Sequence, residues 1–482
     1  MTGLAGVFLA IDLGTSSVKV MLADAEGNAA AVASEGYAVD SPREGWGETH
    51  PDAWWAAIVK AANALDARLR KAVRAAGFTG QMHGVVLCDA DARALRPAIL
   101  WLDTRGKAYL PRFPVDAASR CGNRPSAGMA ASSLLWLKEH DPRCYARAVW
   151  ALQPKDWLRL RMGGTPATDP SDATGTLLAG AEGEWDRELI AALHLRTDWL
   201  APVVRSDAIA GELGADAAVA LGLPRGIPLA VGAADTAATA LGSGLLHEGD
   251  AQLTTGTGGQ IVMMRAAFPG YHQQLNAFRS AHPEGFARWY QMAAMLNVGS
   301  ALEWARAVLG FTWQEAYREA ASVRADRLVF LPYLAGERTP LMDANARGAW
   351  IGLAARDGAG LMMRAAFEGV AFSLRAGLDA LERAGKEVTA LRLAGGGSAQ
   401  PWWRQLLADV LRRPLHAVET ADASARGAAL LAGLATGHWN AGDLERLAPR
   451  ADQVTKPAAS PELEARYDRY AALYPRLKDW FI

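Results

Sequence analysis

The sequence predicts an α/β fold made of two similar domains, and three observations support this prediction. Short apolar segments typical of strands alternate with amphipathic segments typical of helices along the whole chain. A glycine-threonine turn between two apolar segments occurs at Gly14 and again at Gly256, about half of the 482-residue chain later. A chain of this length also has enough residues for two sizeable domains.

The first half begins with a strand at 7–11, a tight turn at Gly14 and a second strand at 18–22. A third strand is expected at 29–38, and a helix at 51–69 follows because its apolar residues recur at helical spacing. The other elements expected in this half are strands at 77–87, 99–105 and 227–231 and helices at 132–139, 155–162 and 234–245.

The second half repeats the opening hairpin at 252–264 and continues with helices and strands in alternation. The expected helices are 297–308, 313–321, 361–384, 400–411, 424–434 and 461–477, and the expected strands are 327–331, 388–393 and 414–417. We place the domain boundary just before the second hairpin, which divides the chain into domains 1–243 and 244–482. The last helix is left free to pack back on the first domain.

Composition excludes several classes of protein. Fifty basic and 51 acidic residues give a net charge of −1, so no strong field attracts nucleic acid or an anionic membrane. The uncharged stretch 227–246 is a poor membrane span, because Asp235 at its centre would be costly in lipid. The three cysteines, Cys88, Cys121 and Cys144, form no CxxC pair, which favours reduced thiols and a cytoplasmic location.

The two glycine-threonine turns are the predicted phosphate-binding elements. No GxxxxGK[ST] motif is present, since Ala108 follows Gly106-Lys107 and Glu387 follows Gly385-Lys386. The turns offer backbone amides and hydroxyl groups to an anion instead, and two facing turns would hold a polyphosphate from both sides. The residues assigned to this nucleotide site are Gly14, Thr15, Ser16, Lys19, Gly256, Thr257 and Gly258. An ordinary hairpin with a polar turn is the alternative for each.

Two further features belong to the same site. Asp12 ends the first strand and is the predicted ligand of Mg²⁺, which binds one or two carboxylates together with phosphate oxygens. Gly395, Gly396 and Gly397 follow a strand and precede a helix, where a nucleotide could approach the backbone closely. A tight strand-to-helix turn explains these three glycines equally well.

Asp235 is the candidate catalytic acid–base residue. It follows the apolar strand at 227–231 and lies among small residues that leave room for a ligand, with Thr236 beside it. A carboxylate placed in this way can take the proton of a hydroxyl group that attacks a phosphoryl group. A helix cap is the alternative role.

The candidate substrate residues are polar or aromatic side chains on loops. They are Gln81, Met82 and His83 after one strand and Trp101 and Asp103 after another, the last two as a sugar platform and a hydroxyl acceptor. The alternatives are a structural histidine, a core tryptophan and a turn acid. The loop Glu337–Pro340 by itself is typical of an exposed surface loop.

Taken in order, these motifs resemble the FGGY carbohydrate kinases, which share the ATPase core of actin, the heat-shock chaperones and hexokinase. Within that family the chain is most similar to the bacterial xylulokinases. The segments that carry the resemblance are Ile11–Ser16, Gly80–Gly84, Arg96–Trp101, Pro154–Met162, Asp169–Thr176, the Asp235 segment, Gly336–Pro340 and the triple glycine followed by Trp402, Trp403 and Arg404.

The resemblance implies two ribonuclease-H-like domains around a central cleft, with sugar mostly on the first and Mg-ATP mostly on the second. It implies transfer of the γ-phosphoryl group of ATP to a hydroxyl of a pentulose such as D-xylulose, with Asp235 as the base. Met82 and His83 then match sugar-contacting positions, Gly256 and Thr257 match the phosphate turn, and Gly395 to Gly397 match the adenosine region.

Three residues depart from the family pattern; two lie on the sugar side and leave other substrates open, and the third, Gly258, only removes a phosphate contact while the backbone amides remain. Thr236 and Leu102 stand where xylulokinases usually have asparagine, and Gly258 stands where the second turn usually has serine. Another ketose or a polyol is therefore an alternative substrate. A chaperone-like or filament-forming ATPase and a catalytically inactive sugar sensor are alternatives of other classes. A homodimer is a candidate assembly that the sequence does not decide.

Overall fold

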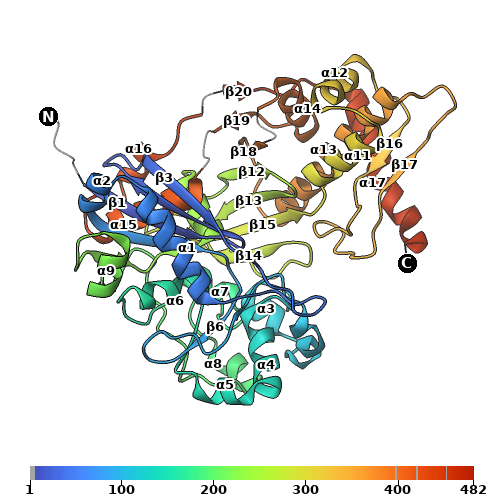
Figure 1. Cartoon of the computed structure of the whole chain (residues 1–482). Helices are drawn as coiled ribbons and strands as arrows, with labels where there is room; N and C mark the ends of the chain where they lie inside the picture. The colour runs from blue at the N-terminus through green and yellow to red at the C-terminus, as the bar shows by residue number, and fades with distance from the viewer. Residues whose placement is uncertain (1–5, 397–398, 419–421, 452, 482) are drawn as a thin grey trace.

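The computed structural model describes residues 6–396, 399–418, 422–451 and 453–481, and two mixed β-sheets dominate them. The first sheet has the order β3-β2-β1-β5-β10-β9, with β11 paired to β5. Its strands are β1 (Val7–Leu13), β2 (Ser17–Ala23), β3 (Ala29–Gly36), β5 (Val73–Gly80), β9 (Ile209–Glu212), β10 (Pro228–Ala230) and β11 (Ala233–Ala234). Figure 1 shows them in blue and green on the left.

The second sheet repeats the arrangement of the first, in the order β14-β15-β13-β12-β18-β19-β20. β12 runs antiparallel to β13 and parallel to β18, just as β1 runs antiparallel to β2 and parallel to β5. Its strands are β12 (Ala251–Thr255), β13 (Gly259–Arg265), β14 (Asn276–Arg279), β15 (Trp289–Met295), β18 (Leu391–Gly395), β19 (Leu415–Ala417) and β20 (Gln453–Thr455). The predicted repeat of the glycine-threonine hairpin is therefore confirmed.

Strand β1 is apolar except for Asp12 because helices cover both faces of its sheet. Leu9 and Ile11 belong to the same apolar cluster as Trp54 of α1 (Pro51–Ala64). Phe8 and Ala10, which point the other way, belong to the cluster that contains α15 (Ala423–Ala435). A continuous apolar run is what a strand buried on both faces requires.

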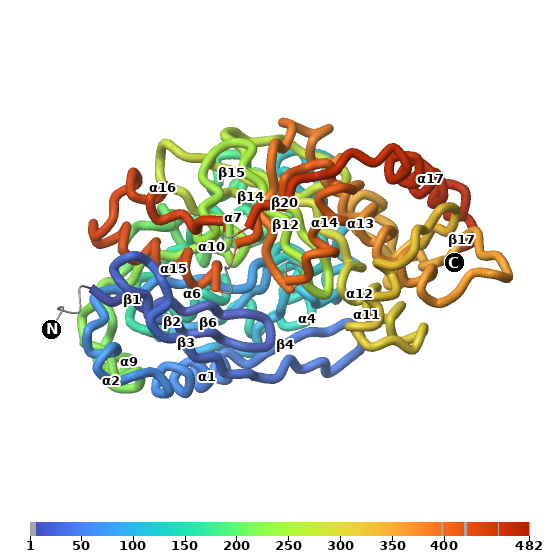
Figure 2. The backbone as a smooth tube through the Cα atoms, turned by 90° about the horizontal axis from the view of Figure 1, so that it is seen from above, coloured from blue at the N-terminus to red at the C-terminus, as the bar shows by residue number. Residues whose placement is uncertain are grey.

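Helix α15 comes from the end of the chain but lies against the first sheet. Both views place it beside β1 (Figures 1 and 2). Glycines allow this approach, since a Cβ atom at Gly77 of β5 would lie 1.9 Å from the carbonyl oxygen of Ala428. Gly427 makes the same close approach to Ala238 of α10 (Asp235–Gly242). The helix that begins with Asp235 is thus packed tightly against α15.

The last helix, α17 (Pro461–Leu477), packs on β16 (Val329–Leu331), α13 (Ala359–Arg383) and α14 (Pro401–Leu411). The sequence leaves this helix free to return to the first domain, but the structure gives that position to α15. The division of the chain at residues 243 and 244 stays a prediction.

The remaining strands are short and lie outside the two large sheets. They are β4 (Glu48–Thr49), β6 (Val86–Cys88), β7 (Ala98–Ile99), β8 (Trp150–Leu152) and β17 (Ala349–Ile351). The expected strand 77–87 is split into β5 and β6, because the chain leaves the sheet after Gly80 to form the Gln81–Gly84 loop.

The remaining helices surround the sheets. In the first half they are α2 (Ala67–Lys71), η1 (Arg105–Arg112), α3 (Ala117–Cys121), α4 (Ala130–His140), α5 (Pro142–Arg147), α6 (Pro154–Arg161), α7 (Pro170–Gly175), α8 (Arg187–Ala192) and α9 (Ala215–Leu221). In the second half they are α11 (Gly299–Val308), α12 (Trp313–Ser322), α16 (Asp443–Leu447) and η3 (Lys478–Trp480). Of the described helices, none combines the length and apolar character that a membrane crossing needs.

Candidate active site

Two adjoining cavities lie where the two sheets meet. The larger, of about 400 Å³, is lined from the first half by Met82, His83, Trp101, Asp235 and Thr236 and from the second half by residues that include Gly256 to Gln260 and Arg338. The smaller, of about 330 Å³, reaches Asp12 and Gly14. Both are lined by Asp235, Thr236, Thr254 and Gln260. Asp235 therefore lies where the larger cavity adjoins the smaller cavity, which is the one beside the first turn.

Asp235 is the first residue of α10 and directly follows β11. The backbone amide and the hydroxyl of Thr236 donate hydrogen bonds to its Oδ1 at 2.5 and 3.1 Å. Burial, and next the nearby charge of Asp12, raise the pKa of Asp235 to about 6. The carboxylate is thus ionised at neutral pH but remains a better proton acceptor than an ordinary aspartate, as general-base catalysis requires.

Asp12 lies at the end of β1, opposite Lys19 in the register with β2. The hydroxyl of Ser424 donates a hydrogen bond to Asp12 Oδ2. Burial raises the pKa of Asp12, while Ser424 and Lys19 oppose the shift. Two half-buried carboxylates near one another, Asp12 and Asp235, make a site that a divalent cation would stabilise.

Lys19 is held by an ion pair with a residue from the second half of the chain. Its Nζ lies 2.6 Å from a carboxylate oxygen of Asp422, which precedes α15. The structure therefore gives Lys19 a carboxylate partner beside the site, and its contact with a nucleotide stays a prediction.

The first turn is fixed by side chains that bind its carbonyl groups. The carbonyl oxygen of Gly14 accepts hydrogen bonds from Gln81 Nε2 at 3.0 Å and from the Tyr37 hydroxyl at 2.5 Å. Trp101 Nε1 donates to Thr15 Oγ1 at 2.9 Å. Gln81 is buried, so its side chain contacts the turn from the protein interior. The structure thus shows Gln81 bonded to the first turn, and a contact of Gln81 with a sugar stays a prediction.

The second turn is fixed by the beginning of α11. Gly299 N donates to the carbonyl oxygen of Gly256 at 2.9 Å, and Ser300 N donates to that of Thr257 at 3.0 Å. A Cβ atom at Gly258 would lie only 2.7 Å from the carbonyl oxygen of Met295. A side chain at position 258 would therefore require the backbone at Met295 to shift.

The glycine run after β18 has a structural role at its first residue. Gly395 pairs with Thr255, has φ of 91°, and has no room for a Cβ atom, which would lie 2.1 Å from the carbonyl oxygen of Thr255. This geometry fits the alternative of a tight turn. Gly396 is exposed next to it, and Gly397 lies outside the described residues. A contact of these glycines with adenosine stays a prediction.

His83 lines the larger cavity as a neutral imidazole. Its Nδ1 lies 2.7 Å from the carbonyl oxygen of Gly175, so Nδ1 carries the proton and donates. Burial, and to a smaller extent the charge of Arg338, lower the pKa of His83 to about 4, while the hydrogen bond to Gly175 opposes this shift. Beside it, the sulfur of Met82 accepts a hydrogen bond from the Tyr290 hydroxyl at 3.7 Å. A neutral histidine can bind a sugar hydroxyl without adding positive charge.

Trp101 and Asp103 have different surroundings in the structure. Trp101 is 38% exposed and lines the larger cavity, and its role as a sugar platform stays a prediction. Asp103 is only 1% exposed, and its carboxylate accepts hydrogen bonds from the Arg105 guanidinium at 2.7 Å and from Gly47 N at 2.7 Å. This corrects the predicted role of Asp103, because its carboxylate is used within the protein.

Arg338 is a cavity residue that the sequence does not single out. The preceding residue, Glu337, is buried and accepts hydrogen bonds from the backbone amides of Leu296 and Arg338 at 2.7 and 2.8 Å. These bonds anchor the loop, so that the exposed Arg338 lines the same cavity as Asp235. The only signal in the sequence is its place in the Gly336–Pro340 motif. The sequence likewise does not identify Thr254 and Gln260 as cavity residues, because their pattern is that of ordinary strand residues.

Comparison with known proteins agrees with this geometry. Residues 7–242 match the N-terminal domain of the FGGY family of carbohydrate kinases, and residues 253–436 match its C-terminal domain. The chain is 36% identical to a xylulose kinase of Escherichia coli K12 and 31% identical to one of Bacillus subtilis 168. Each alignment covers 98% of this chain and 97% of the relative.

A solved structure shows the same fold. The "xyloylose kinase" of Brucella ovis superimposes with a TM-score of 0.92 at 35% identity, covering 98% of this chain and all of the other. The predicted two-domain α/β fold around a cleft is thereby confirmed. The matches span both halves of the chain, and Asp235 and residues of both glycine turns line the two cavities between the sheets. The chain therefore belongs to the FGGY family of carbohydrate kinases and is an ATP-dependent sugar kinase.

Proposed function

We propose that this kinase transfers the γ-phosphoryl group of Mg-ATP to a hydroxyl of D-xylulose, giving D-xylulose 5-phosphate. The names of the relatives, xylulose kinases over almost the full length of both chains, support the choice of sugar. One structural observation carries the proposal: Asp235, with a pKa of about 6, is shared by the cavity that reaches His83 and the cavity that reaches Asp12.

The larger cavity suits a small polar sugar. Trp101 offers an apolar face, His83 offers a neutral ring nitrogen, and Thr236 offers a hydroxyl beside the base. Asp235 then accepts the proton of the attacking hydroxyl while it holds that hydroxyl in line with the phosphoryl group. Because hydroxyl placement decides which sugar is bound well, Thr236 is the residue that we assign to the choice among ketoses.

The phosphate chain fits between the two glycine turns. The Gly256–Gly258 turn lines the larger cavity and Gly14 lines the smaller one, so polyphosphate oxygens would meet both. Mg²⁺, when bound, would shield the negative charges of the phosphates. Asp12 is its proposed ligand, because its carboxylate is half-buried, has a hydroxyl partner in Ser424, and lies near a second carboxylate. Water and phosphate oxygens would complete the coordination.

A coupled assay of ADP release tests the proposal. Pentuloses, hexuloses, polyols and glycerol are each offered to the purified protein with Mg-ATP. We expect D-xylulose to give the highest kcat/KM and to raise ADP release well above the rate without sugar. ADP release that no ketose or polyol increases would favour a chaperone-like or filament-forming ATPase instead.

Two further proposals accompany the function. The three free cysteines, two of them buried, support a location in a reducing compartment such as the cytoplasm. A homodimer stays a proposal that light scattering on the purified chain tests directly.

A further inference from the structure

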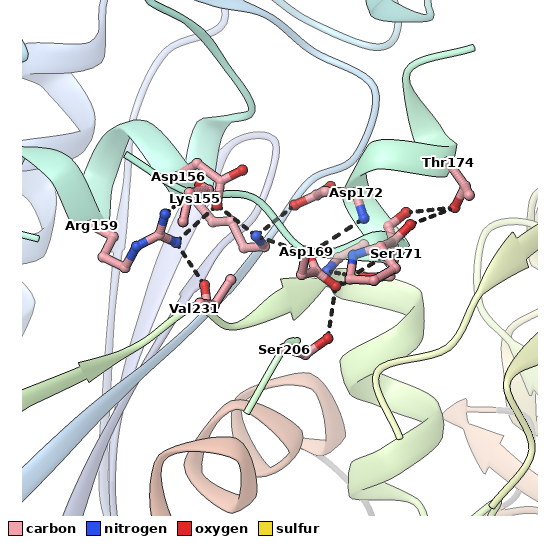
Figure 3. A network of polar contacts seen from close by, with 12 residues as sticks. Lys155, Asp156, Arg159, Asp169, Ser171, Asp172, Thr174, Ser206 and Val231 are labelled. Carbon is pink, nitrogen blue, oxygen red and sulfur yellow. Dashed lines mark hydrogen bonds and ion pairs between the residues drawn. The ribbon is translucent and has the colours of Figure 1, made fainter. Parts of the chain in front are cut away.

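Beside the segment that leads to Asp235 lies a buried ionic network that the proposed chemistry does not use (Figure 3). Lys155 Nζ lies 2.7, 3.0 and 3.1 Å from carboxylate oxygens of Asp156, Asp169 and Asp172. Each of these four side chains is at most 1% exposed. Burying such a cluster costs desolvation free energy, so packing alone does not explain its presence.

The network holds the segment that leads to Asp235 at three successive points. Arg159, which pairs with Asp156, donates from Nη1 to the carbonyl oxygen of Val231 at 2.8 Å. The backbone carbonyl of Ser206 accepts from Gly232 N at 3.0 Å. The hydroxyl of Ser171 accepts from Ala234 N at 3.0 Å. Ala234 is the residue directly before the proposed base.

Ser171 is oriented for this contact by Asp169. The Ser171 hydroxyl has one proton and donates it to Asp169 Oδ2, which leaves an oxygen lone pair for the amide of Ala234. Lys155 Nζ lies 3.0 Å from the other oxygen of Asp169 and holds this carboxyl group in place. Ser206 Oγ also donates to Asp169 Oδ2, at 2.9 Å. The chain of contacts therefore runs from Lys155 through Asp169 and Ser171 to the backbone beside Asp235.

We propose that Ser171, oriented by Asp169, is a positioning residue that fixes the direction of Asp235 toward the attacking hydroxyl. The inference rests on the proposed role of Asp235 as the base. Ala234 directly precedes Asp235. The direction of the Ala234 amide therefore sets where α10 begins and where the Asp235 side chain points. A displacement of about 1 Å in a reacting group can lower a rate by about 100-fold.

Two matched serine variants separate positioning from simple structural support. Ser171→Ala removes the acceptor of Ala234 N, and Ser206→Ala removes a hydroxyl of the same size that binds the same oxygen of Asp169. Only the first change leaves the backbone beside Asp235 without its partner, because the Ser206 contact with Gly232 uses a backbone carbonyl. For each variant, kcat and KM for D-xylulose, KM for ATP and the melting temperature are measured.

We expect kcat of Ser171→Ala to fall by about 10- to 100-fold while KM for D-xylulose changes less than about threefold. We expect kcat of Ser206→Ala to stay within about threefold of the wild type, and Ser171→Ala to lose more melting temperature, because it also leaves the buried amide of Ala234 without an acceptor. If Ser171→Ala melts too low to assay, Ser171→Cys replaces it, and its weaker acceptor predicts a loss of kcat in the same direction.

Equal kcat losses in the Ser171 and Ser206 variants, or a Ser171 loss confined to KM, would overturn the positioning role while the kinase activity of the wild type stands. A wild type that phosphorylates no sugar would instead refute the proposed function, and with it the base that Ser171 serves. The two failures are therefore distinguishable in the same set of assays.

Discussion

Replacing the proposed base should make the protein more stable and much less active. The pKa of Asp235 is raised from 3.8 to about 6, mainly by burial and next by the charge of Asp12. A raised pKa means that the folded protein holds the proton more tightly than the unfolded chain does. The ionised carboxylate therefore destabilises the fold, and the full cost is present above about pH 6.

The size of this cost follows from the shift. At about 1.4 kcal/mol for each pH unit, a shift of roughly two units costs up to about 3 kcal/mol. Asp235→Asn keeps the shape and can still accept from Thr236, but it carries no charge. We therefore expect Asp235→Asn to melt several degrees higher than the wild type at pH 7.5, and the difference to shrink as the pH falls below 6.

The same variant should lose its activity, because an amide cannot accept the proton. General-base catalysis contributes about 10²- to 10⁴-fold, so kcat should fall by that amount while ATP still binds. Differential scanning fluorimetry at pH 5 and pH 7.5 and the coupled ADP assay measure the two effects. A kcat within tenfold of the wild type, or a lower melting temperature at pH 7.5, would refute this reasoning.

Three other predictions follow from the structure. The wild-type kcat/KM should fall about tenfold for each pH unit below 6, as Asp235 gains a proton; a flat profile down to pH 5 would contradict the assignment. Arg338→Ala should lower kcat/KM by about tenfold, because a cation is lost from the cavity wall, yet leave urea unfolding unchanged because the side chain is exposed. Lys155→Met should destabilise the fold by about 3–5 kcal/mol in urea unfolding, because the buried acidic groups around Lys155 lose a cationic partner; a loss below about 1 kcal/mol would contradict this prediction.

The fold could be predicted from local patterns because the two domains repeat one another. The apolar runs around Gly14 and Gly256 are each followed by alternating helices and strands, and the structure contains the two sheets that this repeat implies. The path of α15 could not be predicted in this way. Its return to the first sheet depends on close contacts at Gly77 and Gly427, which join segments far apart in the sequence.

The candidate site was predictable where one residue and its neighbours determine the geometry. Asp235 follows a strand and starts a helix, and His83 lies on a loop after a strand, so both could be placed near a cleft. The role of Asp103 depends on Arg105 and Gly47, and that of Arg338 depends on the anchoring of Glu337. Such partners come from tertiary packing, which the residue types alone do not reveal.

Product analysis tests the central claim most directly. The purified chain is incubated with Mg-ATP and D-xylulose, and ³¹P NMR follows the phosphate species over time. The proposed function predicts one sugar phosphate, identified as D-xylulose 5-phosphate, for each ADP formed, and none with Asp235→Asn. Formation of inorganic phosphate and ADP at the same rate with and without the sugar would contradict it.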